Sequence, residues 1–423
     1  MATNNLKHIL SSLFKWLTII IIVGVIVGSA TAFFLASLDY VTQFRINHIW
    51  MVYFLPFAGL AIGLIYYYYG GAANKGNNIL LETHQALEKG EAQGVSQKII
   101  PLKMAPLVFF STLLTHIAGG SAGREGTAVQ MGGAIADQFT HLFKLNAEDR
   151  KIILIIGISS GFAAVFGTPI AGAIFALEVL CIKNIKMQQI IASFLVAYIA
   201  HYTCLAWQIK HTIYSIPNLP SISIITLTWS IIAGIIFGLA AFAFTYSGKL
   251  FEKLFHKIKY APLRPFLGGI IIAFVILFFN ATKYIGLGIP NIQDAFINNA
   301  GTYDFAIKII FTSFTLSAGF KGGEVTPLFF IGATLGNILV WFIPLPMAVL
   351  AGMGFVAVFS GATNCAITSV FLGIELFGIH AGIYVGLASI VAYFTSGPNG
   401  IYSAQLKWGA KYSAYHYCKK FLK

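Results

Sequence analysis

The chain has 423 residues, which is enough for roughly two or three soluble domains or for one polytopic membrane protein. Its composition favours the second: 57% of the residues are hydrophobic, 10% are charged and the mean hydropathy is +0.80, whereas a soluble domain carries about 25% charged residues. Disordered, fibrous and disulfide-scaffold proteins are excluded by the 37 phenylalanines and by four cysteines that form no Cys-x-x-Cys pair, which also argues against a metal site.

Apolar runs long enough to cross a bilayer, which takes about 20 residues, recur along the chain. In chain order they cover residues 16–38, 49–69, 187–207, 222–247 and 265–281. The first run is too long for the apolar core of a cleavable signal peptide. We therefore expect an all-α protein with many membrane spans.

Residues 325–374 contain no Asp, Glu, Lys or Arg. This stretch is too long for one span, so it must fold back inside the membrane. Breaks are expected where proline and glycine interrupt it, at Pro344, Pro346, Gly352 and Gly361. Short broken helices at membrane depth are tolerated only where they are buried in protein or line a polar cavity.

The formal net charge of +13 would indicate a nucleic-acid partner in a soluble protein. Here the basic residues lie between apolar runs, so the positive-inside rule explains them better, and we expect no nucleic-acid partner. The basic clusters lie at residues 249–264, in the tail from Lys407 to Lys423, and at Lys7 and Lys15. We expect all three clusters, and with them both termini, on the cytoplasmic side.

Parts of the first half of the chain recur in the second half in the same order. The Ser-Ala-Gly triplets at 121–123 and 317–319 precede Glu125 and Glu324, and the Gly-Phe pairs at 161–162 and 354–355 precede Glu178 and Glu375. Two matches in order predict halves at 1–215 and 216–423 that together form one transport domain, because such repeats are typical of transporters and channels. Structural roles at span ends are expected for Glu178 and Glu375.

A glycine-rich turn precedes the acid in each half, at 119–123 and at 319–323. Glycine lets the backbone approach an ion, and the free N–H groups of the following helix form an anion site. Glu125 and Glu324 then lie at predicted helix starts, and ionisable residues at membrane depth are functional candidates. Each carboxylate either complements the helix dipole or occupies the anion site itself. In the second case protonation would release the carboxylate and couple anion passage to protons.

The Gly-x-Ser-x-Gly pattern at 157–161 raises the alternative of an intramembrane serine hydrolase with Ser159 as its nucleophile. That motif requires a strand–turn–helix context. Here it lies in an apolar helical run, where small residues mediate helix packing. A membrane scaffold without transport activity is a further alternative, but it leaves the duplicated glycine-and-acid loops unexplained.

Four short segments complete the pattern. They read Gly-Asn-Asn-Ile-Leu at 76–80, Gly-Arg-Glu-Gly-Thr at 123–127, Gly-Glu-Val-Thr-Pro at 323–327, and Tyr402 near the end of the chain. They resemble the three signature loops (G-S-G-I-P, G-K-E-G-P and G-x-F-x-P) and the late tyrosine of the CLC family of chloride channels and anion/proton antiporters. The resemblance covers essentially the whole chain. Where these segments differ from the family signature, they are similar to those of the fluoride-exporting branch of that family.

The resemblance implies a CLC-type fold of two inverted-topology repeats with tilted and re-entrant helices, and a homodimer in the bacterial plasma membrane. It implies that Glu125 is the gating glutamate, shared by the anion and the proton. The anion-binding residues that it implies are Asn77, Gly123, Arg124, Gly126, Glu324, Val325, Thr326 and Tyr402. The inner proton-transfer glutamate of chloride/proton antiporters corresponds to Val179, which cannot carry a proton, so the proton route must differ. No cofactor and no metal are expected.

The predicted function is export of fluoride in exchange for protons. Fluoride is small and strongly hydrated, so its site must supply several donors, and Asn77 offers two amide hydrogens where a serine offers one. The alternative is a chloride channel or chloride/proton antiporter of the same family. The missing serine and proline of the first loop and Val179 weigh against it. Selectivity also depends on cavity size, which the sequence does not fix.

Overall fold

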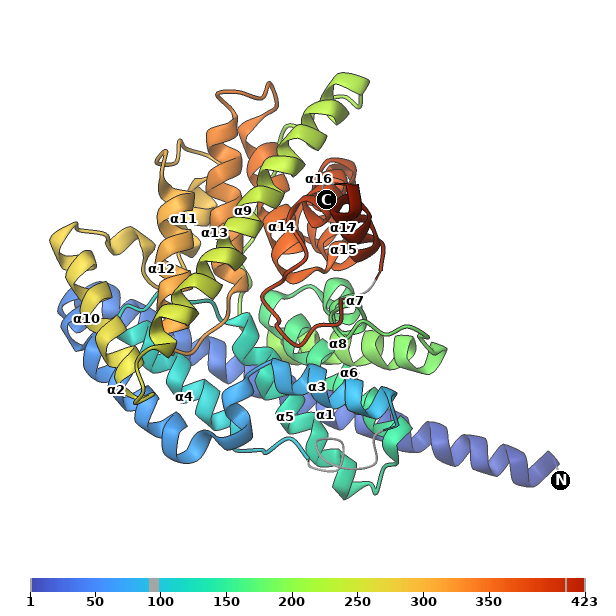
Figure 1. Ribbon diagram of the computed structural model, residues 1–423. Helices are drawn as coiled ribbons and strands as arrows, with labels where there is room; N and C mark the ends of the chain where they lie inside the picture. Colours follow the sequence, from blue (N-terminus) through green and yellow to red (C-terminus); the bar gives the residue numbers. More distant parts are fainter. Residues whose placement is uncertain (1, 91–98, 408, 422–423) are drawn as a thin grey trace.

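Every element in the part of the chain that the structure describes is helical. The structure is a computed structural model, and it describes residues 2–90, 99–407 and 409–421. Figure 1 shows helices that cross one another at several tilts, with the amino-terminal end of the first helix projecting beyond the rest. The prediction of an all-α protein is confirmed for these residues. Lys423, used above to place the tail, lies outside them.

The first half of the chain forms eight α-helices among the described residues. They are α1 (Ala2–Asn47), α2 (Leu55–Ile65), α3 (Asn78–Glu88), α4 (Met104–Ile117), α5 (Glu125–Leu142), α6 (Ala147–Phe166), α7 (Pro169–Val179) and α8 (Met187–Ala206). Short 3-10 or π turns at Ile49–Phe54, Tyr66–Gly70 and Gly71–Lys75 join α1 to α3.

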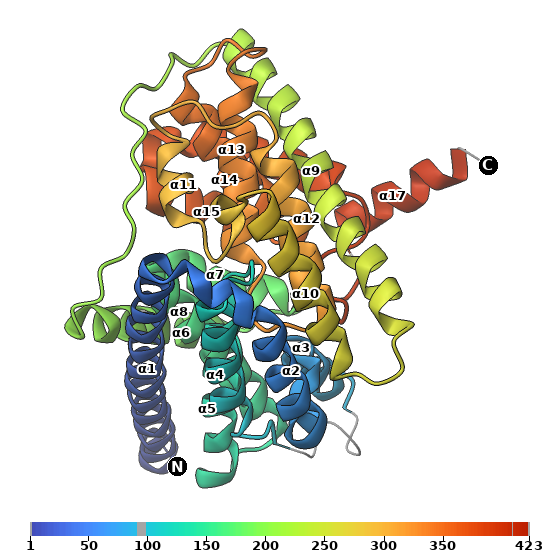
Figure 2. The ribbon, with the colours of Figure 1, turned by 90° about the vertical axis from the view of Figure 1, so that its left-hand side faces the viewer.

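The second half continues with nine helices in its described residues. They are α9 (Ile224–His256), α10 (Leu263–Phe278), α11 (Ile289–Asp294), α12 (Asp304–Ala318), α13 (Val325–Leu339), α14 (Met347–Thr363), α15 (Ala366–Phe377), α16 (Gly382–Thr395) and α17 (Ala410–Phe421). Residues 209–223 contain no helix and form a long extended connection from α8 to α9 (Figure 2). The predicted boundary between the halves falls in this connection.

The described helices include four stretches long and apolar enough to cross a membrane, at Leu10–Asn47, Ile49–Glu88, Met187–Ala206 and Ile224–His256. They contain or closely match the predicted runs, except the run at 265–281, which forms the shorter helix α10. Several other apolar helices are also shorter than a bilayer is thick. Short helices leave their ends inside the protein, where those ends can face an ion.

The uncharged stretch from 325 to 374 folds back on itself, as expected, but not at all the predicted places. The chain breaks between α13 and α14 around Pro344 and Pro346. Gly352 and Gly361 lie inside α14, so the prediction of breaks there is wrong. The second break follows Asn364, whose left-handed conformation (φ 58°) ends α14. Gly361 instead makes room for packing, because a Cβ there would lie 2.8 Å from the Cβ of Ala241.

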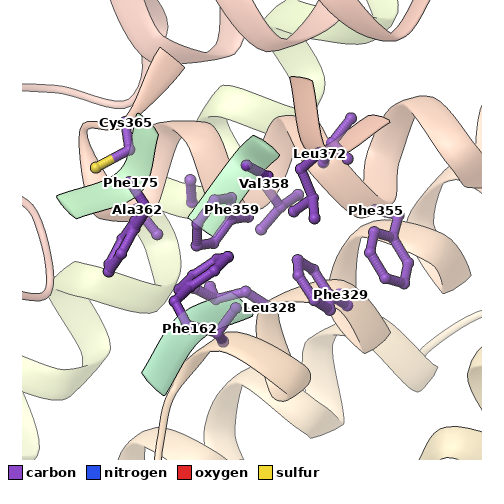
Figure 3. Close-up of a cluster of buried hydrophobic side chains, with 14 of the residues drawn as sticks. Phe162, Phe175, Leu328, Phe329, Phe355, Val358, Phe359, Ala362, Cys365 and Leu372 are labelled. Carbon is purple, nitrogen blue, oxygen red and sulfur yellow. The ribbon is translucent and has the colours of Figure 1, made fainter. Parts of the chain in front are cut away.

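Phenylalanines from both halves meet in the centre of the molecule (Figure 3). Phe162 and Phe175 come from α6 and α7, and Phe329, Phe355 and Phe359 come from α13 and α14; all five are at most 2% exposed. The rings of Phe329 and Phe355 stack with centroids 3.8 Å apart. Because lipid tails are as apolar as these rings, van der Waals contact rather than exclusion from water stabilises such packing in a membrane.

Close glycine contacts join neighbouring helices in the same way in both halves. A Cβ on Gly132 would lie 2.2 Å from the oxygen of Gly157, and a Cβ on Gly332 would lie 2.0 Å from the oxygen of Gly354. The helices α5 and α6, and likewise α13 and α14, therefore pack backbone against backbone. By these contacts Gly157 in the first half corresponds to Gly354 in the second half. The sequence match instead pairs Gly354 with Gly161, which lies one helical turn after Gly157.

Candidate anion site

Two helices begin at the same place, one from each half of the sequence. The glycines just before them form two backbone hydrogen bonds: Gly323 N donates to Gly123 O at 2.8 Å, and Gly123 N donates to Gly323 O at 2.5 Å. A Cβ on Gly123 would lie 2.9 Å from the Gly323 oxygen, so a larger residue would push the helix starts apart. The positive ends of α5 and α13 therefore converge, an arrangement that attracts an anion.

The paired glycines correct the alignment of the two halves by one residue. Helix α5 begins at Glu125 and α13 begins at Val325. Glu324 therefore occupies the place of Arg124, and not the place of Glu125 that the Ser-Ala-Gly match assigned to it. That match was misleading because Ser317 and Ala318 still belong to α12, whereas their partners at 121–122 lie in the loop.

The carboxylate of Glu125 lies between the two helix starts and is 1% exposed. Its Oε2 accepts hydrogen bonds from Arg124 N and Thr326 N, each at 3.1 Å. Its Oε1 accepts a short hydrogen bond from the hydroxyl of Thr326 and lies 3.8 Å from Arg124 Nε. The carboxylate thus takes N–H groups at both helix starts, and its donors come from both halves of the chain. The Glu125 carboxylate can have one of two roles: complementing the dipole of its own helix, or occupying the anion site. The geometry favours the second.

A cavity of about 670 Å³ is lined by Arg124, the neighbour of Glu125 in the chain, and is named here the Arg124 cavity. Its charged lining residues are Arg45, Arg124, Lys210, Lys283 and Asp39. Four cations therefore face one carboxylate, and such an excess of one charge in a cleft raises the local concentration of the opposite ion.

A second cavity, of about 170 Å³, is named here the Tyr402 cavity. It contains three predicted site residues, Asn77, Glu324 and Tyr402, and shares no lining residue with the Arg124 cavity. The carboxylate of Glu125 is bonded to the N–H of Arg124, which lines the Arg124 cavity, and to Thr326, two residues after Glu324, which lines the Tyr402 cavity.

Asn77 meets the site from a third helix start. It precedes α3 but makes no capping hydrogen bond, and its Oδ1 is buried with no partner in the described part of the chain. A Cβ on Gly126 would lie 3.1 Å from Asn77 Nδ2, so this amide lies against the first turn of α5. The structure thereby brings Asn77 and Gly126 together as predicted.

Two further predicted anion-site residues, Tyr402 and Val325, lie in different surroundings. Tyr402 lies in the loop between α16 and α17, is 8% exposed and lines the Tyr402 cavity. Val325 is 1% exposed and packs in the apolar core, and its side chain lines neither cavity. Val325 is the first residue of α13, and its side chain points into the apolar core. Only its backbone can therefore belong to the site.

Sequence reasoning missed several polar residues near the site. Gln130 and Lys321 line the Tyr402 cavity. Lys308 is fully buried and donates to the carbonyls of Tyr284 and Gly286 at 3.0 and 2.9 Å. Two signals could have found these residues: Gln130 lies one helical turn after Gly126, and Lys308 is a single cation in an apolar helix.

Ser159 does not occupy a nucleophile elbow. It lies within α6, is fully buried, and donates its hydroxyl to the carbonyl of Ser193 in α8 at 2.8 Å. A serine in this position contributes to helix packing, as the apolar run predicted. The geometry gives the hydrolase alternative no support.

Residues 82–397 match the family of voltage gated chloride channels. The chain belongs to this CLC family. It is 45% identical over 399 residues to a chloride/fluoride channel protein of Pseudomonas syringae pv. tomato, which covers 92% of this chain and 86% of that protein. The fold is similar to a crystal structure of a CLC-type fluoride/proton antiporter, with a TM-score of 0.87 and 32% identity over 93% of this chain and 98% of that one.

A more distant solved structure shares the same fold. It is a slow cyanobacterial Cl⁻/H⁺ antiporter, with a TM-score of 0.77 and 20% identity over 90% of this CLC chain and 94% of that one. The prediction of a CLC-type fold of tilted helices is confirmed. The chain is therefore an integral membrane protein of the CLC family and an anion transporter.

Proposed function

We propose that this CLC chain exports fluoride from the cell in exchange for protons. The observation that carries the proposal is the position of Glu125, whose carboxylate accepts hydrogen bonds at the starts of both α5 and α13. A negatively charged group that fills an anion site competes directly with a travelling anion. The similar proteins named as a fluoride/proton antiporter and a chloride/fluoride channel support fluoride as the cargo.

The exchange follows from the two forms of one carboxylate. When Glu125 is ionised, it holds the N–H groups of Arg124 and Thr326 and closes the path between the two cavities. A proton removes its charge, so its hydrogen bonds to N–H groups weaken and the side chain can leave. The anion then takes the vacated donors and passes. Because the carboxylate and the anion use the same donors in turn, proton movement in one direction is coupled to anion movement in the other.

Fluoride selectivity depends on the donors that replace its water. Beyond the backbone N–H groups, the site offers the amide of Asn77 and the hydroxyls of Thr326 and Tyr402. A small cavity with short hydroxyl and amide donors suits a small anion with high charge density. Chloride transport by the same route is the alternative, since one similar protein carries both ions in its name.

The proton route differs from one that would use the position of Val179, which is 2% exposed and apolar. Its neighbour Glu178 is not available, since its carboxylate accepts the N–H groups of Ile367 and Thr368 at the start of α15. Glu324 is the carboxylate that lines the Tyr402 cavity. We place the end of the proton route that is remote from the Arg124 cavity at Glu324.

The remaining parts of the proposal concern assembly and orientation. We propose a homodimer in the bacterial plasma membrane, on the strength of the family resemblance, and two inverted halves at 1–215 and 216–423. Both termini are placed in the cytoplasm by the positive-inside rule. The Arg124 cavity, lined by residues from the carboxyl-terminal part of α1, would then face outward.

The test is flux from liposomes that contain the purified protein. Fluoride and chloride efflux are recorded with ion-selective electrodes while proton uptake is followed with a pH electrode. We expect fluoride to leave much faster than chloride, with protons entering in a fixed ratio to it. Equal rates for the two halides would end the fluoride assignment, and fluoride efflux without proton uptake would end the antiporter assignment.

A further inference from the structure

The loop that carries Tyr402 is held in place by side chains of another element. Both backbone polar groups of Ala404 are bonded by α3: the Ala404 N–H donates to Asn78 Oδ1 at 3.0 Å, and the Ala404 carbonyl accepts from Gln85 Nε2 at 2.6 Å. Asn78 and Gln85 are seven residues apart on α3, so they lie on the same face of that helix. These two side chains are named here the α3 clamp.

The α3 clamp adjoins the Tyr402 cavity: Asn78 is one of its lining residues, whereas Gln85 is not. Asn78 directly follows Asn77, and Ala404 lies two residues after Tyr402. Residues 396–407 and 409, the described part of the loop between α16 and α17, contain no helix that would fix Tyr402. A shift of Ala404 away from α3 would therefore move the tyrosine away from Asn77 and widen the cavity between them.

The opposite side of the loop is held separately. The N–H of Ile401 donates to the carbonyl of Ala362, at the end of α14, at 2.8 Å. Tyr402 is thus suspended between α14 on one side and α3 on the other. The loop is also held at the end of α14 by Asn364 Nδ2, which donates to Gln405 Oε1 at 3.1 Å. The α3 clamp is the attachment in which side chains bond both backbone polar groups of one loop residue, so substitution can remove it without changing the loop's own sequence.

We propose that Asn78 and Gln85 are positioning residues that set halide selectivity by fixing the width of the Tyr402 cavity. This inference rests on the proposed function, in that it assumes halides pass through this cavity. A rigid small site rejects the larger chloride because the donors cannot move apart to admit it, whereas a flexible site adapts to either ion. Loosening the clamp therefore admits chloride while it leaves Glu125 and its donors in place.

A matched control comes from α5. Gln138 Nε2 donates to the carbonyls of Ile100 and Ala134, each at 2.8 Å, and it lines neither cavity. Gln138→Leu and Gln85→Leu each replace one side-chain amide by an apolar group of similar size; the first frees two backbone carbonyls and the second frees one. A merely structural role predicts the same outcome for both variants, whereas the proposal predicts a change in selectivity for Gln85→Leu alone.

The experiment measures chloride and fluoride efflux from liposomes for the wild type, Gln85→Leu, Gln138→Leu and Asn78→Ala. We expect the ratio of chloride to fluoride efflux to rise about fivefold in Gln85→Leu, the factor that corresponds to one lost hydrogen bond, and to rise in Asn78→Ala as well. Gln138→Leu should keep the wild-type ratio. Asn78→Ala serves as the test if Gln85→Leu does not fold.

The outcomes separate this inference from the proposed function. An unchanged ratio in both clamp variants, beside a selective and coupled wild type, overturns the inference alone. If the wild type moves halides without protons, the antiporter proposal fails, and the selectivity ratios still decide the role of the clamp. If no flux occurs, the fluoride and chloride affinities of the same four proteins, measured by titration calorimetry in detergent, replace the flux ratios. Equal affinity ratios for all four would then overturn the inference.

Discussion

The helix pairs α4–α5 and α12–α13 share a frame but differ in the chemistry attached to it. Corresponding positions make corresponding contacts: Ile100, Gly123, Gly132 and Asp137 in the first pair match Ala300, Gly323, Gly332 and Asn337 in the second. In each pair a buried side chain near the end of the second helix accepts the N–H of a residue before the first helix. The frame therefore depends on backbone approach and one acceptor, not on a particular charge.

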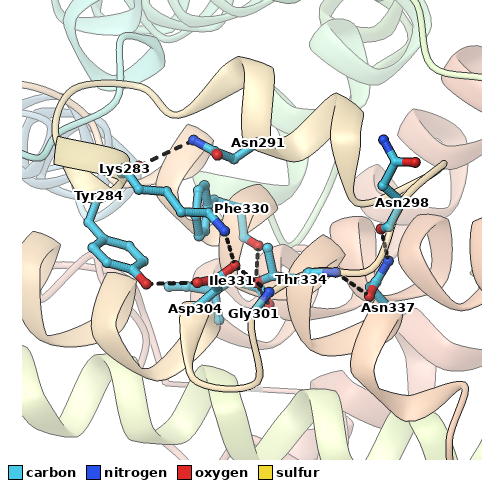
Figure 4. Close-up of polar contacts among 11 residues, drawn as sticks. Lys283, Tyr284, Asn291, Asn298, Gly301, Asp304, Phe330, Ile331, Thr334 and Asn337 are labelled. Atoms are coloured by element: carbon cyan, nitrogen blue, oxygen red, sulfur yellow. Dashed lines mark hydrogen bonds and ion pairs between the residues drawn. The ribbon is translucent and has the colours of Figure 1, made fainter. Parts of the chain in front are cut away.

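The acceptors themselves differ. Asp137 accepts the Ile100 N–H at 2.8 Å and also pairs with the buried Arg150, whose Nη2 lies 2.7 Å from Asp137 Oδ2. Asn337 accepts the Ala300 N–H at 2.9 Å and donates to the carbonyls of Ala295 and Asn298, so it needs no counter-ion. Figure 4 shows Asn337 beside Asn298. A buried carboxylate requires a cation, whereas a buried amide satisfies both its donors and its acceptor with the backbone.

The same asymmetry occurs at the site. The first half supplies the charged pair Arg124 and Glu125, and the second half supplies Glu324 and Val325 at the matching positions. The carboxylate of Glu125 crosses to donors of Thr326 in the other half. Two similar frames thus contribute to one site, in which we propose Glu125 as the single gating group, and this division of roles can be tested.

The largest expected effect comes from Glu125→Gln. The glutamine amide is neutral and neither binds nor releases a proton at ordinary pH. We therefore expect loss of proton coupling, together with severe loss or uncoupling of anion transport. The measurement is fluoride efflux and proton uptake in liposomes. Coupled exchange at the wild-type rate in this variant would remove Glu125 from its role.

The next largest effect is expected when each buried acceptor is replaced by the residue type found in the other half, as Asp137→Asn and Asn337→Asp. Asp137→Asn removes a carboxylate that pairs with the buried Arg150, and Asn337→Asp faces a carboxylate with two carbonyl oxygens, so each should destabilise the fold by about 3–5 kcal/mol. The measurement is unfolding in detergent micelles. The double variant Asp137→Asn, Arg150→Met should recover most of the loss, since both charges of this buried pair are removed together. Wild-type stability in both single variants would show that the two frames are chemically interchangeable.

A smaller effect is expected at the donor from the second half. Thr326→Val keeps the shape of the side chain but removes the hydroxyl that serves Glu125 and, in turn, the anion. Loss of one hydrogen bond of about 1 kcal/mol should weaken apparent fluoride affinity about fivefold, as measured from the fluoride dependence of the transport rate. Thr334→Val is the control, because its hydroxyl bonds only to backbone carbonyls of its own helix. Equal effects of both substitutions would contradict the assignment.

The smallest effects should be alike in the two halves. Glu178 accepts the N–H groups at the start of α15, and Glu375 accepts those of Ile170 and Ala171 at the start of α7. Glu178→Gln and Glu375→Gln each remove a charge from a helix start, which should cost about 0.3–1 kcal/mol. The thermal unfolding midpoint in detergent measures this. A large loss in only one variant would break the proposed equivalence of the caps.

Much of the site could be predicted because its residues are close together in the sequence. Glycine-rich turns before acids identified Gly123, Glu125 and Gly126, and the structure brings them to one helix start. The match between halves failed by one residue at Glu324 and by one turn at Gly161. Short sequence matches locate a repeat but not its register, because register is set by which backbones pack, as at Gly132 and Gly157.

Residues that act across the chain were out of reach of the sequence. The reciprocal caps of Glu178 and Glu375 and the bonds of Asn78 and Gln85 to Ala404 join positions far apart in the chain. No local pattern marks them, since a glutamate at a helix end or a glutamine on a helix has many ordinary uses. Gly352 and Gly361 mark the same limit, because packing and not chain breakage explains those glycines.

By itself the sequence determined that this protein lies in a bilayer, because its apolar runs are long and carry few charges. It also predicted an anion site, because glycine turns before helices leave N–H groups of the first helical turn unpaired. Only the tertiary structure decided that the start of α5 faces the start of α13, that Glu125 finds donors in Thr326, and that Arg124 and Glu324 line two separate cavities. The reason is physical. Hydropathy and turn chemistry act between neighbours in the chain, whereas an ion site needs donors from several elements, and their meeting depends on how whole helices pack.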